Sequence, residues 1–77
     1  MMKKLDLHRT RHDDAKRKVI RFVEDGWGSK EEVEIITGNS QRMKDIVIDV
    51  LTEYGLDAQI GRKFDVNNKG YIVTWLE

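Results

Sequence analysis

The sequence predicts a single α/β domain, residues 1–77, in which two helices pack on one face of a four-stranded mixed sheet. Two observations carry this prediction. Two segments have the apolar spacing of amphipathic helices, and short strand-like segments precede, separate and follow them, giving the order β-α-β-α-β-β. Right-handed βαβ crossovers place both helices on the same face, and a short turn makes the last two strands antiparallel. The expected architecture is therefore a two-layer α+β sandwich.

The first strand and the first helix are predicted from the N-terminal third of the chain. Residues 4–8 alternate apolar and polar side chains, as a half-buried strand does. Thr10 is a candidate N-cap, with Asp13 at the position of a capping-box acid. Apolar residues then recur at helical spacing, at Ala15, Val19, Phe22 and Val23. Because Gly26 is a natural stop, the helix is expected over residues 13–25.

The second strand and the second helix follow. Residues 33–37 are short and mostly β-branched, which predicts a strand. Asn39 and Ser40 are both good N-caps for the helix after it. That helix has the cleanest apolar pattern in the chain, formed by Met43, Ile46, Val47, Val50, Leu51 and Tyr54. Gly55 ends it.

The last two strands are predicted on either side of a turn. Apolar residues of one parity indicate the third strand, at Leu56, Ala58, Ile60 and Phe64. Residues 67–70 are rich in asparagine and glycine and form the turn. Residues 71–76 are β-branched, aromatic and aliphatic, which predicts the fourth strand.

The composition excludes several classes of protein. The chain has no cysteine, so it has neither a disulfide framework nor a cysteine-type zinc site. No apolar run approaches the roughly 18 residues that a membrane span needs, and residues 1–6 lack the apolar stretch of a signal peptide. No His, Asp or Glu spacing matches a metal-site motif, and no cofactor is indicated. We expect a cytoplasmic domain without membrane contact.

The net charge of zero conceals an asymmetry along the chain. Residues 1–21 carry eight basic and three acidic side chains, whereas residues 22–77 carry six basic and eleven acidic ones. The first part therefore has a net charge of +5 and the second of −5. The basic part is suited to a polyanion. The alternative interpretation is an ordinary solvated helix face.

Two segments reach the sheet edge where ligands usually bind, beyond the carboxyl ends of the parallel strands. These are residues 6–9 and residues 37–40. The second segment leads into a helix N-terminus, whose unpaired N–H groups and dipole favour a phosphate. Gly38 would let the backbone approach a ligand closely, and Arg42 lies just beyond it. The alternative is that this turn only caps the helix.

Asp6 and His8 are the candidate catalytic pair. Residues two apart on a strand share one face, so their side chains are expected on the same side. A carboxylate can orient an imidazole, and histidine is the usual general acid or base near neutral pH. The alternative is a structural pair at the end of the strand.

Together these motifs resemble the Smr (small MutS-related) domain family. Its opening L-D-L-H-G motif is matched by Leu5–His8, and its second motif, [H/T]-G-x-G, is matched by Thr37 and Gly38. The motifs stand about 30 residues apart, and the similarity covers almost the whole chain. The resemblance implies the fold of the C-terminal domain of a bacterial translation initiation factor. It also implies a nucleic-acid-binding domain or an endonuclease that acts on DNA or RNA.

In our first interpretation, a domain of this kind that binds nucleic acid, particular residues have the following roles. His8 would act as general acid or base, assisted by Asp6, while Arg9 and Arg11 would hold neighbouring phosphates. A phosphate would rest at the start of the second helix, on Thr37, Gly38, Asn39, Ser40 and Arg42. The sequence departs from the family at two motif glycines, which are here Arg9 and Ser40.

Two alternative functions follow from the same residues. If the motif has decayed at the two missing glycines, the domain binds nucleic acid without cleaving it. The third interpretation is a protein-interaction domain. Its last strand is apolar on both faces, with Tyr71, Val73 and Trp75 on one and Ile72, Thr74 and Leu76 on the other, whereas a two-layer fold leaves one face of the sheet uncovered. That face would then pair with a partner or with a second copy as a homodimer.

Overall fold

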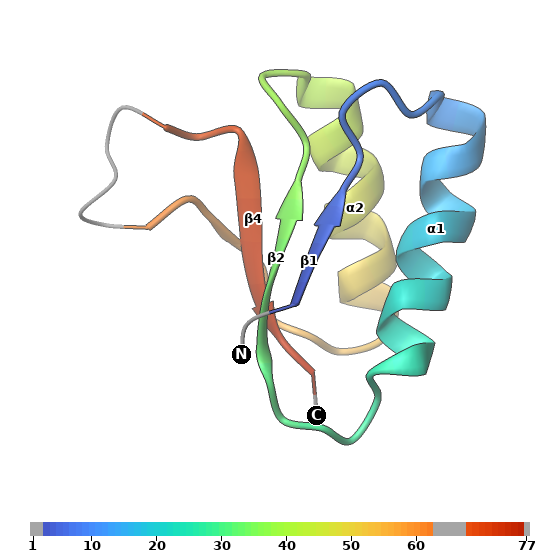
Figure 1. Ribbon diagram of the computed structural model, residues 1–77, viewed down its shortest axis with the longest axis vertical. Coiled ribbons are helices and arrows are strands. Elements are labelled where there is room, and N and C mark those ends of the chain that lie inside the picture. The colour runs from blue at the N-terminus through green and yellow to red at the C-terminus, as the bar shows by residue number, and fades with distance from the viewer. Residues whose placement is uncertain (1–2, 63–67, 77) are drawn as a thin grey trace.

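The computed structural model describes residues 3–62 and 68–76 (Figure 1). Over these residues the chain forms the elements in the predicted order. Their bounds are Lys3–Asp6 (β1), His12–Asp25 (α1), Glu32–Ile36 (β2), Gln41–Glu53 (α2), Gln59–Ile60 (β3) and Tyr71–Trp75 (β4). Neither of these two helices is long and apolar enough to cross a membrane.

The strands form one mixed sheet in the order β1-β2-β4-β3. β1 and β2 are parallel, with Leu5 opposite Ile35, whereas β4 is antiparallel to β2, with Ile72 opposite Ile35. β3 is antiparallel to β4. Figure 1 shows both helices on the same side of the sheet. The predicted two-layer mixed sandwich is therefore confirmed, with β1 and β3 at the edges.

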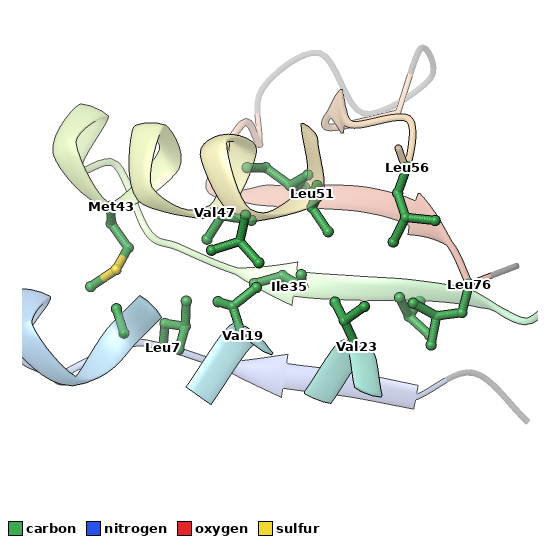
Figure 2. Close-up of a cluster of buried hydrophobic side chains, with 13 residues drawn as sticks. Leu7, Val19, Val23, Ile35, Met43, Val47, Leu51, Leu56 and Leu76 are labelled. Carbon is green, nitrogen blue, oxygen red and sulfur yellow. The ribbon is translucent and has the colours of Figure 1, made fainter. Parts of the chain in front are cut away.

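The core lies between the helices and the face of the sheet that they cover (Figure 2). Val33 and Ile35 on β2 and Ile72 on β4 share that face and have no exposed surface. The helices contribute Ala15, Val19, Val23, Met43, Val47, Val50 and Leu51. The predicted core side of α2 is confirmed, with Ile46 only partly buried at its margin.

The start of α1 differs from the prediction. The helix begins at His12, its N-cap is Arg11, and no side chain caps it. The predicted Thr10 N-cap is wrong because the carbonyl of Arg11 accepts the first N–H groups of the helix, those of Asp14 and Ala15, at 3.0 Å each. The backbone N–H of Thr10 closes the preceding turn, donating to the carbonyl of Leu7 at 2.9 Å.

The third strand is shorter than the prediction. Within residues 3–62 and 68–76, it is Gln59 and Ile60 that pair with β4 in this strand. Leu56 is buried in the core as the chain leaves α2, so it precedes the strand rather than belonging to it. Gly61 then takes a φ of +66°, which turns the chain after two paired residues. Phe64, the last residue of the predicted strand, lies outside the described residues.

The face of the sheet away from the helices carries a polar network. Arg62 donates to Glu32 Oε2 at 2.8 Å, and the indole N–H of Trp75 donates to Glu32 Oε1 at 3.1 Å. Tyr71 and Val73 are only 6% and 1% exposed. The protein-interaction alternative assumed an uncovered apolar face, and this assumption is wrong for these two residues. Trp75, at 37% exposed, remains accessible there.

Arg62 joins two carboxylates of β2 from the far side of β4. Besides Glu32, it reaches Glu34 Oε1 at 3.3 Å, and Lys4 Nζ lies 3.7 Å from the other oxygen of Glu34. The hydrogen bond from Arg62 is the main cause that lowers the pKa of Glu32 below its ordinary value of 4.5. The same bond raises the pKa of Arg62. The network therefore favours the charged form of both groups.

Candidate functional site

Three segments are tied together at one edge of the sheet. The backbone N–H of Leu7 donates to Ile36 at 2.8 Å, which joins the ends of β1 and β2. The N–H groups of Thr37 and Gly38 both donate to the carbonyl of Gly70, at 2.8 and 2.9 Å, which joins the end of β2 to the start of β4. Figure 1 shows that α1 and α2 both begin at this edge. The two segments singled out in the sequence are therefore neighbours.

The first of these segments, after β1, is a tight turn. The Asp6 carboxylate accepts the backbone N–H of His8 at 2.8 Å. This hydrogen bond stabilises the turn and does not orient the imidazole. The Thr10-to-Leu7 hydrogen bond closes it. Arg9 occupies the third turn position with a φ of +67°, a conformation that glycine adopts far more readily than other residues. The turn therefore keeps a backbone shape suited to glycine although the residue is arginine.

Replacing Arg9 with glycine is expected to stabilise the fold. A left-handed φ costs an L-residue about 1–2 kcal/mol. This exceeds the roughly 0.5–1 kcal/mol by which the greater backbone entropy of glycine stabilises the unfolded chain. Arg9→Gly should therefore raise the free energy of unfolding by about 0.5–1 kcal/mol in urea titrations.

Lys69→Gly is the matched control for this substitution. It also removes an exposed basic side chain from a turn, but Lys69 is not among the residues with positive φ. We expect it to destabilise the protein slightly, through the unfolded state alone. Equal effects of the two substitutions would show that the conformation of Arg9 carries no strain.

The second segment, between β2 and α2, places two glycines in close contact. Gly38 has a φ of +68°. A Cβ on Gly70 would stand 3.3 Å from the Cα of Gly38, so the two backbones pass each other closely. Thr37 is buried, and its hydroxyl donates to the Gly38 carbonyl at 3.0 Å. These contacts fix the direction in which α2 begins.

Ser40 caps α2, as the sequence predicts. Its hydroxyl accepts the N–H of Met43 at 3.1 Å, and its backbone is extended with a φ of −74°. The serine therefore needs no glycine-like backbone, and its side chain satisfies one of the unpaired N–H groups of the helix.

The exposed groups at this edge are mostly basic or polar. They include His8, Arg9, Arg11, His12, Asn39 and Arg42, beside the exposed carboxylates of Asp6 and Asp13. α2 has no acidic residue in its first turn, whereas α1 has Asp13 and Asp14 in its first turn. The positive end of the α2 dipole is therefore not neutralised locally by a carboxylate, and Arg42 adds a full charge beside it. Such a surface favours a phosphate or another anion.

Two contributors to this region lack a signal in the sequence. Gly70 was predicted only as part of a turn, yet its carbonyl accepts two N–H groups from the β2–α2 segment. Arg62 was not singled out at all, and together with Lys4, Tyr71 and Gly70 it lines a hollow of about 470 Å³ on the adjoining face of the sheet. Both residues join segments about 30 residues apart, which local patterns do not reveal.

No group of three or more His, Asp or Glu side chains within residues 3–62 and 68–76 is placed to hold a metal ion. In comparisons with known proteins, no family model, no curated protein and no solved structure matches the chain.

Proposed function

We propose that this domain binds the phosphate backbone of nucleic acid at the edge where β1 and β2 end. The observation that carries the proposal is the start of α2, which lacks a first-turn acid, has Arg42 beside it and opens on the same edge as the β1 turn. Phosphates on this edge are bound by the backbone N–H of Asn39 and by Arg9, Arg11 and Arg42, since the N–H of Gly38 already donates to Gly70. Contacts of this kind position a nucleic acid without selecting its sequence.

We further propose that His8 acts as general acid or base in cleavage of the bound backbone. Its exposure in the turn after β1, beside the second segment, supports this role. The backbone of Arg9 supports it too, because its φ of +67° is a conformation that the glycine of the Smr motif adopts readily. Asp6 supports His8 by fixing the backbone of the turn.

The double substitution Arg9→Ala/Arg11→Ala tests the binding proposal. It should weaken binding to all sequences alike, by about tenfold at moderate salt, because it removes two phosphate-binding side chains. The slope of log K against log salt should become shallower by roughly 0.7–0.9 for each phosphate that is no longer neutralised. Fluorescence anisotropy with labelled DNA and RNA over a salt series measures both quantities.

Lys16→Ala/Arg17→Ala is the charge-matched control for this experiment. Both side chains lie on α1 away from the turns, and Arg17 is already paired with Asp14 at 3.0 Å. If both doubles weaken binding equally, the attraction reflects overall charge and the proposed edge is not the binding surface. If the parent protein binds no nucleic acid, the proposed function falls.

A further inference from the structure

A small groove beside β1 lies outside the edge described above. It has a volume of about 230 Å³ and is lined by Leu5, Lys18, Arg21, Phe22 and Asp25, a set that we call the β1–α1 groove. Leu5 and Phe22 pack against the core but remain partly exposed, so they give the groove an apolar floor. Lys18 and Arg21 are exposed and form its basic rim.

The groove runs alongside an edge strand. β1 is first in the strand order, and β2 is its only neighbour among the described strands. One side of its backbone therefore leaves N–H and C=O groups available to a ligand. The groove thus combines apolar contact, hydrogen-bonding groups and positive charge in one place.

The basic rim of the groove continues to the phosphate-binding edge. Lys18 and Arg21 are three residues apart and lie on one face of α1, and Arg11, seven residues before Lys18, is the N-cap of that helix. Asp14, four residues before Lys18, is paired with Arg17. At 1.5 Å of rise per residue, Arg21 lies roughly 15 Å along the helix from Arg11. Arg21 is only loosely paired, since its nitrogen lies 3.9 Å from Asp25 and both side chains are largely exposed. It therefore stays available to a phosphate.

The exposed face of α2 is acidic and repels a polyanion. Asp45, Asp49 and Glu53 on α2 are exposed and recur every four residues, which forms an acidic stripe. Asp49 and Glu53 line a separate groove between the helices, together with Lys16 of α1 and with Arg42 in the first turn of α2. A nucleic acid bound at the edge where the helices begin is therefore repelled by α2 and attracted along the β1 side of α1.

From this arrangement we infer that the β1–α1 groove binds single-stranded nucleic acid, with phosphates on Lys18 and Arg21 and a base against Leu5 and Phe22. The inference rests on the proposed function and names its substrate class. A base reaches an aromatic side chain only when it is unstacked from its neighbours, as in single strands, loops and ends. The groove accepts such a base, whereas the paired bases of a duplex are not free to enter it.

The test compares Lys18→Ala/Arg21→Ala with the charge-matched Lys16→Ala/Arg17→Ala. Binding of a labelled single-stranded DNA and RNA 15-mer, and of the duplex of the same sequence, is measured by anisotropy over a salt series. The groove variant should bind the single strands about tenfold more weakly, and its salt slope should become shallower by roughly 1.4, for two phosphates at about 0.7 each. The matched control should change affinity less than twofold.

Phe22→Leu tests the base contact separately, because it keeps an apolar side chain at the groove and preserves the fold. It should weaken single-strand binding about fivefold or more and leave the salt slope unchanged, since stacking involves no counterion. Far-ultraviolet circular dichroism and the urea midpoint confirm that the variant is folded.

The outcomes separate the inference from the proposed function. Equal losses in the groove variant and its control, or no preference of the parent for single strands, would overturn the inference. If Arg9→Ala/Arg11→Ala still weakened binding in that case, the proposed phosphate binding where β1 and β2 end would be retained. A parent protein that binds neither form overturns both. If the protein forms a concentration-dependent dimer and Lys18→Ala/Arg21→Ala disrupts that dimer, the β1–α1 groove is an interface with a second copy. This result would also overturn the inference.

Discussion

His8→Ala is expected to lower the rate of nucleic-acid backbone cleavage by roughly 10²–10⁴-fold, the usual contribution of a general acid or base. The imidazole would take a proton from the attacking water or give one to the leaving oxygen, and alanine does neither. Binding should change little, because the phosphate contacts are assigned to arginines and a backbone N–H. Folding should survive, because His8 is exposed in a turn after β1.

His12→Ala is the matched control for this substitution. His12 is the other histidine of the chain, is also exposed, and lies at the first residue of α1. We expect it to change the cleavage rate less than twofold. The rate is measured with end-labelled single- and double-stranded DNA and RNA, after each variant has been shown to bind as the parent does. A preparation that cleaves equally well without His8 contains a contaminating nuclease, and the protein would then be a binding module.

Asp6→Asn refines the assignment of the two residues. In the structure the Asp6 carboxylate accepts the backbone N–H of His8, a bond that an asparagine oxygen also accepts. If Asp6 acts only through the turn, the asparagine variant retains most of the rate. A loss as large as that of His8→Ala would instead assign the charge of Asp6 to the reaction. The sequence suggested an Asp6 contact with the imidazole because it predicted a strand through residue 8, whereas β1 ends at Asp6.

Much of the fold could be predicted because its determinants are local. The spacing from Met43 to Leu51 is set by helix geometry, and Met43, Val47, Val50 and Leu51 are buried as expected, whereas Ile46 is partly buried. The β-branched segment before Gly38 became β2, which is central in the sheet and therefore strongly specified. β3 was less predictable because, among the described residues, it is formed by Gln59 and Ile60 alone. Leu56 and Ala58, whose spacing suggested a strand, lie in the segment that leads from α2 to the sheet.

The candidate site was predictable only in part, for a physical reason. The carboxyl ends of β1 and β2 meet because parallel neighbours always do, and this follows from the βαβ order. Gly70 and Arg62 reach the region through pairing of β4 with β2 and through ion pairs across the sheet. Those contacts depend on the strand order, in which β4 lies between β2 and β3, and no sequence pattern states that order.

Leu51→Ala is expected to destabilise the fold by about 2–4 kcal/mol, through reduced burial and the cavity that remains. Leu51 has no exposed surface and lies on α2 in the middle of the core (Figure 2). At the usual 0.05–0.15 kcal/mol per residue, a domain of this size has a total stability of about 4–12 kcal/mol. One side chain would therefore carry a large share of it. Urea denaturation should show a lower midpoint with an unchanged m-value.

Thr52→Ala is the control, since Thr52 is the next residue of α2 and is exposed. Its effect should stay within about 0.5 kcal/mol, because an exposed substitution creates no cavity. Alanine also has a higher helix propensity than threonine, so any small change should be stabilising. If Leu51→Ala cost no more than Thr52→Ala, α2 would not be packed against the sheet through this face. The start of α2 would then not be held at the edge where the phosphate site is proposed.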